Sequence, residues 1–234
     1  MRLNRFLMKF DLNQDNLRIN DFEIYNQIRN VLRLKSGEQI ILFDGESNEV
    51  KAEILNIDHE NKIIDLIVLE REKNQQEPKK EVILYCSILK RENFELVAQK
   101  VTEIGISRIV PMICERTVKM GIRKERLKKI VKEASEQSGR GIIPGISEQI
   151  SFEQAIEQAK ENNLNLFFDI SGESIKSYEA KPRKIGLFVG PEGGWSDGEL
   201  ELAKKNNFGI VKLSELNFRA ETAAIIASYL ACLL

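Results

Sequence analysis

The feature that most constrains the fold is the alternation of apolar segments and amphipathic segments from residue 81 onward. Residues 82–89 form an apolar run, and residues 94–104 carry apolar side chains at spacings of three and four. Residues 106–113 are apolar again. Strands that alternate with helices form a parallel sheet covered by helices on both faces. The pattern therefore predicts an α/β domain over residues 81–234.

Local signals predict where the helices of this domain begin and end. Ser151 and Ser196 are each followed three residues later by Gln or Glu, which is a capping box. Asn93 is a candidate N-cap for the first helix, and Gly105 suits its C-terminus. The other predicted elements are a basic helix over 123–138, strands over 164–170, 185–189 and 210–213, and an apolar helix over 220–234.

The front of the chain has a different character. Asp21 predicts the start of a helix whose buried side chains are Ile24, Ile28, Val31 and Leu32. Short strands follow, and Asp44-Gly45 is typical of a hairpin turn. The predicted strands are 38–43, 50–57 and 62–69, which together indicate a small β-barrel domain over 1–72 followed by an apolar-free linker over 73–80.

Several chemistries are disfavoured by the residues available. The only histidine, His59, lies in a polar stretch that reads as a turn, which argues against a Ser-His-Asp or Cys-His group. Cys86, Cys114 and Cys232 lie in separate apolar segments, so we expect reduced core cysteines and no metal site. No apolar run approaches the ~18 residues of a membrane helix, and no signal peptide is evident. We therefore expect a cytoplasmic protein.

The formal net charge of −1 hides an uneven distribution. Residues 79–140 contain 15 Lys and Arg against 8 Asp and Glu. Such a surplus fits either a solvated helix face or a surface that binds a phosphate backbone, and the charge count alone leaves both open.

A glycine-rich segment over residues 188–196 is the first candidate for chemistry. In a parallel sheet, ligands bind beyond the carboxyl ends of the strands, and this segment joins a strand to a capped helix. The phosphate-binding patterns GxxxxGK[ST] and GxGxxG are absent from the chain. Glu192 in the middle of the segment would repel a phosphate, so the loop suits a neutral or cationic ligand.

A polar cluster at the start of the last helix is the second candidate. Arg219, Glu221 and Thr222 precede the most apolar helix of the chain. A cation near a helix N-terminus is unfavourable, so something else should hold Arg219 there. We expect Glu192, Glu221 or a bound anion to do so.

The order of these motifs resembles the 16S ribosomal RNA uridine-N3 methyltransferases of the SPOUT superfamily. The strongest matches are GPEGG at 190–194 and FRAETA at 218–223. Smaller matches extend along nearly the whole chain: Arg5-Phe6, Val31-Leu32-Arg33-Leu34, Gly37-Glu38, Phe43-Asp44-Gly45, Lys90-Arg91, Gln99-Lys100, Glu103-Ile104-Gly105, Glu133-Ala134, Gln137-Ser138 and Arg140.

The resemblance implies a PUA-like barrel over 1–72 and a SPOUT α/β domain with a deep trefoil knot over 81–234. It further implies homodimers that bind S-adenosylmethionine and methylate N3 of a uridine in the decoding region, with 16S rRNA or the small ribosomal subunit as partner. The residues implied to bind the cofactor are Phe168, Val189, Gly190, Pro191, Glu192, Gly193, Leu213, Leu216, Asn217, Phe218, Ala220 and Thr222.

The implied reaction asks for particular side chains. N3 of uridine must lose a proton, and the resulting charge spreads onto two carbonyl oxygens, which Arg219 could stabilise. Glu192 or Glu221 could accept the proton or orient Arg219, and the sequence leaves both open. N3 lies on the Watson–Crick edge, so the base must be unpaired, which requires a grip on the RNA. The expected phosphate contacts are Arg2, Arg5, Arg33, Lys90, Arg91, Arg116 and Arg140.

The chain departs from the family pattern beside the second motif. Leu213-Ser214 stands where the family usually has Leu-Gly, and Asn217-Phe218 stands where it usually has Ile-Leu. These changes keep open a non-catalytic RNA-binding or ribosome-assembly factor on the same fold. A second alternative is a SPOUT methyltransferase that acts on another RNA. A third is an unrelated α/β enzyme that handles a nucleotide, which the missing phosphate loops disfavour.

Overall fold

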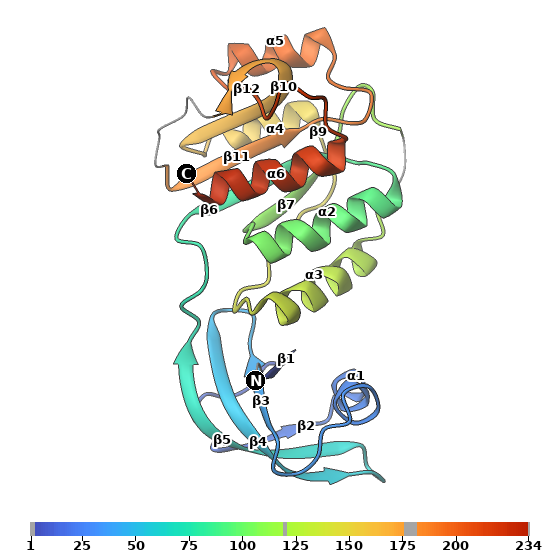
Figure 1. Cartoon of the computed structure of the whole chain (residues 1–234), viewed down its shortest axis with the longest axis vertical. Helices are drawn as coiled ribbons and strands as arrows, with labels where there is room; N and C mark the ends of the chain where they lie inside the picture. Colours follow the sequence, from blue (N-terminus) through green and yellow to red (C-terminus); the bar gives the residue numbers. More distant parts are fainter. Residues whose placement is uncertain (1–2, 119–120, 176–181, 234) are drawn as a thin grey trace. The chain divides into compact units, whose positions relative to one another are not determined.

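A computed structural model describes residues 3–118, 121–175 and 182–233, and the chain divides into two compact units (Figure 1). The first unit contains residues 1–77 and 135–143, and the second contains the remainder. Residues 135–143, which the sequence places in the second domain, therefore belong to the first compact unit.

The first unit is built on a mixed sheet in the order β1-β3-β4-β5-β2. β1 pairs with β3 in parallel, and the other neighbours are antiparallel. The predicted strands are confirmed, but β1 and β2 were not predicted because each spans only four residues. The elements are β1 (Asn4–Leu7), β2 (Asn16–Ile19), α1 (Phe22–Asn26), the π-helical turn η1 (Gln27–Val31), β3 (Gln39–Phe43), β4 (Asn48–Asp58) and β5 (Ile63–Lys73).

The predicted helix of the first unit is shorter and more irregular than expected. Asp21 is its N-cap, as predicted, and the side chains of Ile24 and Ile28 are buried. The prediction that Val31 and Leu32 are buried is wrong, since they are 67% and 37% exposed. A π-helical turn follows α1, and its wider hydrogen-bond spacing breaks the 3.6-residue periodicity on which the prediction rested.

The second unit contains a parallel sheet in the order β12-β10-β11-β6-β7-β8, with β9 also paired to β7. The predicted α/β alternation is confirmed. Its strands are β6 (Glu81–Ser87), β7 (Arg108–Ile113), β8 (Gly145–Ile146), β9 (Ile150–Ser151), β10 (Leu164–Ser174), β11 (Lys184–Val189) and β12 (Gly209–Lys212). The helices are α2 (Arg91–Ile104), α3 (Lys124–Ser138, which continues into the first unit), α4 (Phe152–Ala159), α5 (Asp197–Lys205) and α6 (Ala220–Leu233).

The helices cover both faces of this sheet (Figure 1). α6 packs on β6 and β11 with α2 beside it, whereas α4 packs on β7 from the opposite face. On the α4 face, Tyr85 stacks on Phe188 at a centroid distance of 4.5 Å, and Phe167 stacks on Trp195 at 4.2 Å. Phe152 of α4 contacts this aromatic cluster edge-on. Aromatic pairs of this kind add rigidity to the carboxyl end of the sheet.

Most predicted helix boundaries are confirmed. Both capping boxes form, at Ser151 and at Ser196, and Gly105 ends α2 with a φ of +114°. The prediction that Asn93 caps α2 is wrong, because the helix begins at Arg91 and its N-cap is Lys90, whose side chain makes no capping bond. The trefoil knot stays a prediction.

His59 and two of the cysteines lie where the sequence indicates. His59 lies in the turn between β4 and β5, and its Nδ1 is 3.1 Å from the hydroxyl of Tyr25. Cys86 and Cys114 are buried thiols, and burial raises the pKa of Cys114 to about 12. Within the described residues, no group of His, Cys, Asp and Glu could hold a metal ion. Nor is any helix of that part of the chain long and apolar enough to cross a membrane.

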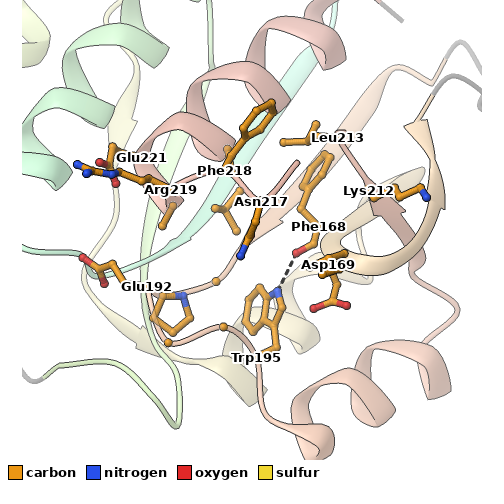
Figure 2. Close-up of a pocket in the computed structure, with 18 of the residues that line it drawn as sticks. Phe168, Asp169, Glu192, Trp195, Lys212, Leu213, Asn217, Phe218, Arg219 and Glu221 are labelled. Atoms are coloured by element: carbon orange, nitrogen blue, oxygen red, sulfur yellow. Dashed lines mark hydrogen bonds between the residues drawn. The ribbon is translucent and has the colours of Figure 1, made fainter. Parts of the chain in front are cut away.

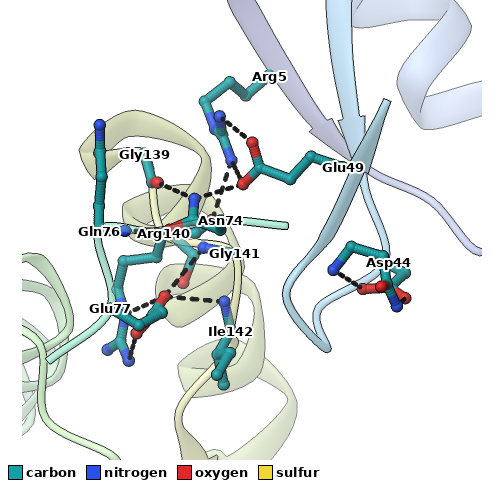
Figure 3. Close-up of polar contacts among 12 residues, drawn as sticks. Arg5, Asp44, Glu49, Asn74, Gln76, Glu77, Gly139, Arg140, Gly141 and Ile142 are labelled. Carbon is teal, nitrogen blue, oxygen red and sulfur yellow. Dashed lines mark hydrogen bonds and ion pairs between the residues drawn. The ribbon is translucent and has the colours of Figure 1, made fainter. Parts of the chain in front are cut away.

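A buried polar network holds residues 139–142 inside the first unit (Figure 3). Oε2 of Glu77 accepts from Nη2 of Arg140 at 2.8 Å, and its Oε1 accepts from the backbone N–H groups of Gly141 and Ile142, each at 2.9 Å. The two charged side chains are only 13% and 8% exposed. Glu77 thus satisfies several donors at once, which is what makes a buried ion pair favourable.

A second part of the same network centres on Glu49. Its carboxylate accepts from Arg5, with Nη1 to Oε2 at 3.0 Å, and from the amide of Asn74. Asn74 also donates to the carbonyl of Gly139 at 3.0 Å. The guanidinium of Arg5 additionally lies over the ring of Phe43, 5.3 Å from its centroid. Four segments far apart in the sequence are therefore joined by polar contacts to Glu49 and Asn74.

We predict that Glu77→Ala lowers the free energy of unfolding by about 3 kcal/mol, because it removes a buried carboxylate that pairs with the Arg140 guanidinium and accepts from the backbone N–H groups of Gly141 and Ile142. Urea unfolding followed by circular dichroism measures this. The matched control is Glu201→Ala, which breaks the exposed pair with Lys204 and should change stability by less than about 0.5 kcal/mol. Equal effects of the two variants would contradict the role given to Glu77.

Candidate active site

A pocket of about 780 Å³ lies within the second unit, where β11 and β12 end (Figure 2). Both motifs singled out in the sequence contribute to its wall. Thr222 is the one predicted cofactor residue that does not line it. The predicted residues that do line it are Phe168, Val189, Gly190, Pro191, Glu192, Gly193, Leu213, Leu216, Asn217, Phe218 and Ala220, together with Arg219 and Glu221.

The glycine-rich loop rests on the indole of Trp195. A Cβ placed on Gly190 would lie 2.8 Å from Cε2 of Trp195, so only glycine fits at that position. The indole N–H donates to the carbonyl of Phe168 at 2.9 Å, which ties the loop to β10. A turn within the loop is closed by Gly194 N and the carbonyl of Pro191 at 2.9 Å. The loop is therefore held in one shape by packing and by its own hydrogen bonds.

Glu192 is an exposed side chain that contacts the start of α2. Its Oε1 accepts from the backbone N–H of Lys90 at 3.2 Å. The N–H groups at a helix N-terminus have no intrahelical acceptors, and a carboxylate there is favoured by the helix dipole. Glu192 therefore accepts from the backbone N–H of the N-cap residue itself, and this contact joins the loop to α2.

Glu221 has the opposite character. It is only 8% exposed, and its Oε2 is buried without a hydrogen-bond partner among the described residues. Leaving a buried carboxylate oxygen unpaired costs free energy, so such groups are rare in stable folds. Because Glu221 also lines the pocket, it is a candidate for direct contact with a ligand.

Arg219 lines the pocket as an exposed side chain. It forms no ion pair with any residue that the structure describes, so neither Glu192 nor Glu221 holds it in this state. An unpaired cation and an unpaired buried carboxylate therefore lie two residues apart at the start of α6 (Figure 2). This arrangement can bind a polar ligand through both charges.

The structure separates the predicted phosphate contacts into two groups. Arg5 and Arg140 are engaged in the buried ion pairs of the first unit. Arg33 and Lys90 are exposed, while Arg91 is exposed and pairs with Glu95 on its own helix. Arg116 donates to the carbonyl of Gly193. Arg2 lies outside the described residues.

The sequence analysis missed residues that line the pocket from β10. The pairing of β10 with β12 shifts register between Phe168 and Glu173, so the intervening residues leave the ladder. Asp169 and Ile170 reach the pocket from this bulge. The signal was the Ser-Gly step directly after an apolar strand, which is typical of a bulge. The other pocket-lining residues outside the predicted cofactor and catalytic set are Lys90, Asn93, Gly194, Trp195, Val211, Lys212, Ser214 and Ala223, of which Lys90 was predicted as a phosphate contact.

Comparison with known proteins places this fold and pocket in a family. An RNA methyltransferase domain family matches residues 75–231, and an RNA methyltransferase PUA domain family matches residues 19–67. The ribosomal RNA small subunit methyltransferase E of Rickettsia conorii is 32% identical over 206 residues, covering 86% of this chain and 82% of that protein. The protein of the same name from Bacillus subtilis is 28% identical over 225 residues, covering 88% and 85%.

Solved structures agree. A ribosomal RNA small subunit methyltransferase E from Neisseria gonorrhoeae, bound to S-adenosyl methionine, superposes with a TM-score of 0.89 at 27% identity and covers 97% of this chain and 95% of that one. A putative methyltransferase from Legionella pneumophila with bound SAM gives 0.87 at 29% identity, covering 99% and 97%.

The fold and the two matched domains are those of an RNA methyltransferase with a PUA domain. The chain belongs to the ribosomal RNA small subunit methyltransferase E family. The family resemblance, and the fold class of a PUA-like domain followed by a SPOUT α/β domain, are confirmed.

The chain's single tryptophan allows a direct test of how the loop is supported. We predict that Gly190→Ala shifts the fluorescence emission of Trp195 and destabilises the protein by about 1–3 kcal/mol, because the added methyl overpacks against the indole. Gly198→Ala in α5 is the control, since its Cβ would have no atom nearer than 3.9 Å. Unchanged emission and stability in Gly190→Ala would show that the loop is not held by this contact.

Proposed function

We propose that this protein transfers the methyl group of S-adenosylmethionine to N3 of a uridine in 16S rRNA of the small ribosomal subunit. The observation that carries the proposal is the pair of unsatisfied charges in one pocket wall, the buried Glu221 carboxylate and the unpaired Arg219. The family, and the cofactor bound in the relative from Neisseria gonorrhoeae, support the same reaction.

The residues present fit this cofactor. A cationic ligand suits a pocket whose buried, unpartnered group is the carboxylate of Glu221. The chain also lacks phosphate-loop patterns, as expected for a ligand without phosphates. The residues that would hold the cofactor are the loop 190–193 and the segment 213–218, both of which line the pocket. When bound, the cofactor supplies an activated methyl group on a positively charged sulfur.

Arg219 and Glu221 have different roles in the reaction at the uridine base. Arg219 stabilises the negative charge that develops on a carbonyl oxygen as N3 loses its proton. We assign to Glu221 the role of accepting that proton or of orienting Arg219 toward the base, because Glu221 is the buried carboxylate of the pocket wall with an unpartnered oxygen. Most of the rate comes from holding the base and the methyl donor in line, which the rigid loop favours.

The positions that depart from the family pattern still build a pocket wall. Ser214 accepts from the N–H of Leu216 through its hydroxyl at 3.1 Å, so the serine shapes its own turn. Asn217 and Phe218 both line the pocket. This favours an enzyme over a non-catalytic RNA-binding or assembly factor. Calorimetric titration with S-adenosylmethionine discriminates between the two, and analysis of the methylated nucleoside discriminates between uridine N3 and another RNA target.

Replacing Arg219 or Glu221 should lower methyl transfer, whereas replacing an acid on the surface outside the pocket should not. We predict that Arg219→Ala binds S-adenosylmethionine normally but lowers kcat about 100- to 1,000-fold, the usual cost of removing one transition-state donor. Glu221→Gln should also lower kcat at least tenfold. Glu201→Gln, which replaces an exposed acid of α5 that pairs with Lys204 outside the pocket, should keep wild-type activity. Radiolabelled methyl transfer to small subunits measures all three, and normal turnover by Arg219→Ala would refute the assignment.

We further propose that Arg33, Lys90 and Arg91 contact RNA phosphates, because they are exposed cations in the segments that resemble the family. Binding should then weaken steeply with salt. Arg91→Ala should reduce the slope of log K against log salt by about 0.7 to 0.9, the value for one phosphate contact. Lys204→Ala on α5 should leave the slope unchanged. Salt-independent binding measured by fluorescence anisotropy would contradict this surface.

A homodimer in the cytoplasm completes the proposal. Tyr229 and Leu233 on α6 are 56% and 66% exposed, an apolar surface that a second copy could cover. Light scattering of the purified protein tests this, and a monomer mass at micromolar concentration would contradict it. The cytoplasmic location follows from a ribosomal substrate.

A further inference from the structure

A turn over residues 114–117, which follows β7, contacts the glycine-rich loop at Gly193. Nη1 of Arg116 donates to the carbonyl of Gly193 at 3.1 Å. The stem of the same side chain lies against the loop, since a Cβ on Gly193 would be 3.2 Å from Cβ of Arg116. Arg116 does not itself line the pocket. Its contacts therefore act on the loop and only through the loop on a ligand.

The 114–117 turn is itself held rigidly. Thr117 N donates to the carbonyl of Cys114 at 3.0 Å, and Cys114 N donates to Oγ1 of Thr117 at 2.8 Å. The same Oγ1 is 2.8 Å from the hydroxyl of Ser87, a fully buried residue at the end of β6. The backbone of Arg116 is thus anchored to the central strand of the sheet.

The turn also contacts the helix that follows the loop. Glu115 N donates to Oε1 of Glu199 at 2.9 Å, while Oε2 of Glu199 accepts from Ser196 N at 2.9 Å in the capping box of α5. Glu199 is only 6% exposed. Both ends of the segment from Gly193 to Ser196 are therefore tied to the same turn.

We propose that Arg116 is a positioning residue for the cofactor loop, and that its guanidinium holds the Gly193 carbonyl in the orientation that S-adenosylmethionine binding requires. This rests on the proposed function and deepens it, because it gives a predicted RNA contact a role in cofactor affinity. A loop held in its binding conformation before the ligand arrives loses less entropy on binding. The planar guanidinium can donate while its stem packs along the loop, which an ammonium cannot reproduce.

The first test separates the geometry of Arg116 from its charge. Arg116→Lys and Arg116→Ala should each raise the Kd for S-adenosylmethionine about three- to tenfold in calorimetric titration, the usual effect of losing one charge-assisted hydrogen bond at a partly exposed site. Arg116→Lys should keep the wild-type dependence of RNA binding on salt. Arg126→Lys is the matched control, because Arg126 is exposed and pairs with Glu95 away from the loop.

A second pair of variants changes the 114–117 turn at Thr117 and leaves the Arg116 side chain intact. Thr117→Val removes the hydroxyl that anchors the turn to Ser87 and Cys114 and should raise the same Kd. Thr117→Ser keeps the oxygen and should restore the wild-type value. A loss of affinity that the serine does not restore would mean that the turn acts through its packing, contrary to the proposal.

The outcomes are distinguishable from failure of the proposed function. If the wild-type protein does not bind S-adenosylmethionine, the proposed function fails, and with it the basis for this role. If the wild-type protein binds and Arg116→Lys binds equally well, the proposed function stands and the positioning role is overturned. Loss of RNA affinity alone in Arg116→Ala would overturn it too, and would make Arg116 a phosphate ligand.

Discussion

The contact between the glycine-rich loop and Trp195 is the constraint on which the rest of the pocket depends. The indole contacts Gly190 and stacks on Phe167, and its N–H donates to the carbonyl of Phe168. Any shift of the loop would break a stacking contact and leave a buried donor unpaired. The loop is therefore fixed by its contacts with the aromatic core of the sheet, and these contacts also hold the pocket wall in place.

The two acids of the pocket show how environment divides roles among similar side chains. Glu192 is solvent-exposed, and its carboxylate accepts from the Lys90 N–H at the start of α2. Glu221 is buried beside the pocket with one oxygen unpaired. Replacing Glu192 would loosen the loop, whereas replacing Glu221 would remove a charge that nothing in the described part of the protein balances. Burial and the unpartnered oxygen thus make Glu221 a better candidate than Glu192 for contact with a ligand.

Periodicity and capping signals predicted most of the fold because they are local. Ser151 and Ser196 begin helices as expected, since a capping box needs only residues three apart. Asn93 failed as a cap because the helix begins earlier, at Arg91, where the N–H of the N-cap residue Lys90 donates to Glu192, a residue 102 positions away. Likewise, the bulge of β10 depends on how β12 pairs with it. The Ser171-Gly172 step could have indicated a bulge from the sequence alone. The pairing with β12 decides that the bulge brings Asp169 to the pocket, and local spacing does not report that pairing.

The arginines show why a count of charges alone overestimates the number of residues that can bind a nucleic acid. A surplus of cations in residues 79–140 suggested phosphate contacts, but an arginine's partner is decided by the fold. Arg140 is buried against Glu77, and Arg5 is buried against Glu49, so neither can reach a phosphate without breaking a costly pair. The cations left for RNA are the exposed ones. An arginine in a family motif can therefore have a purely structural role. Its burial distinguishes such a structural arginine from one that contacts RNA.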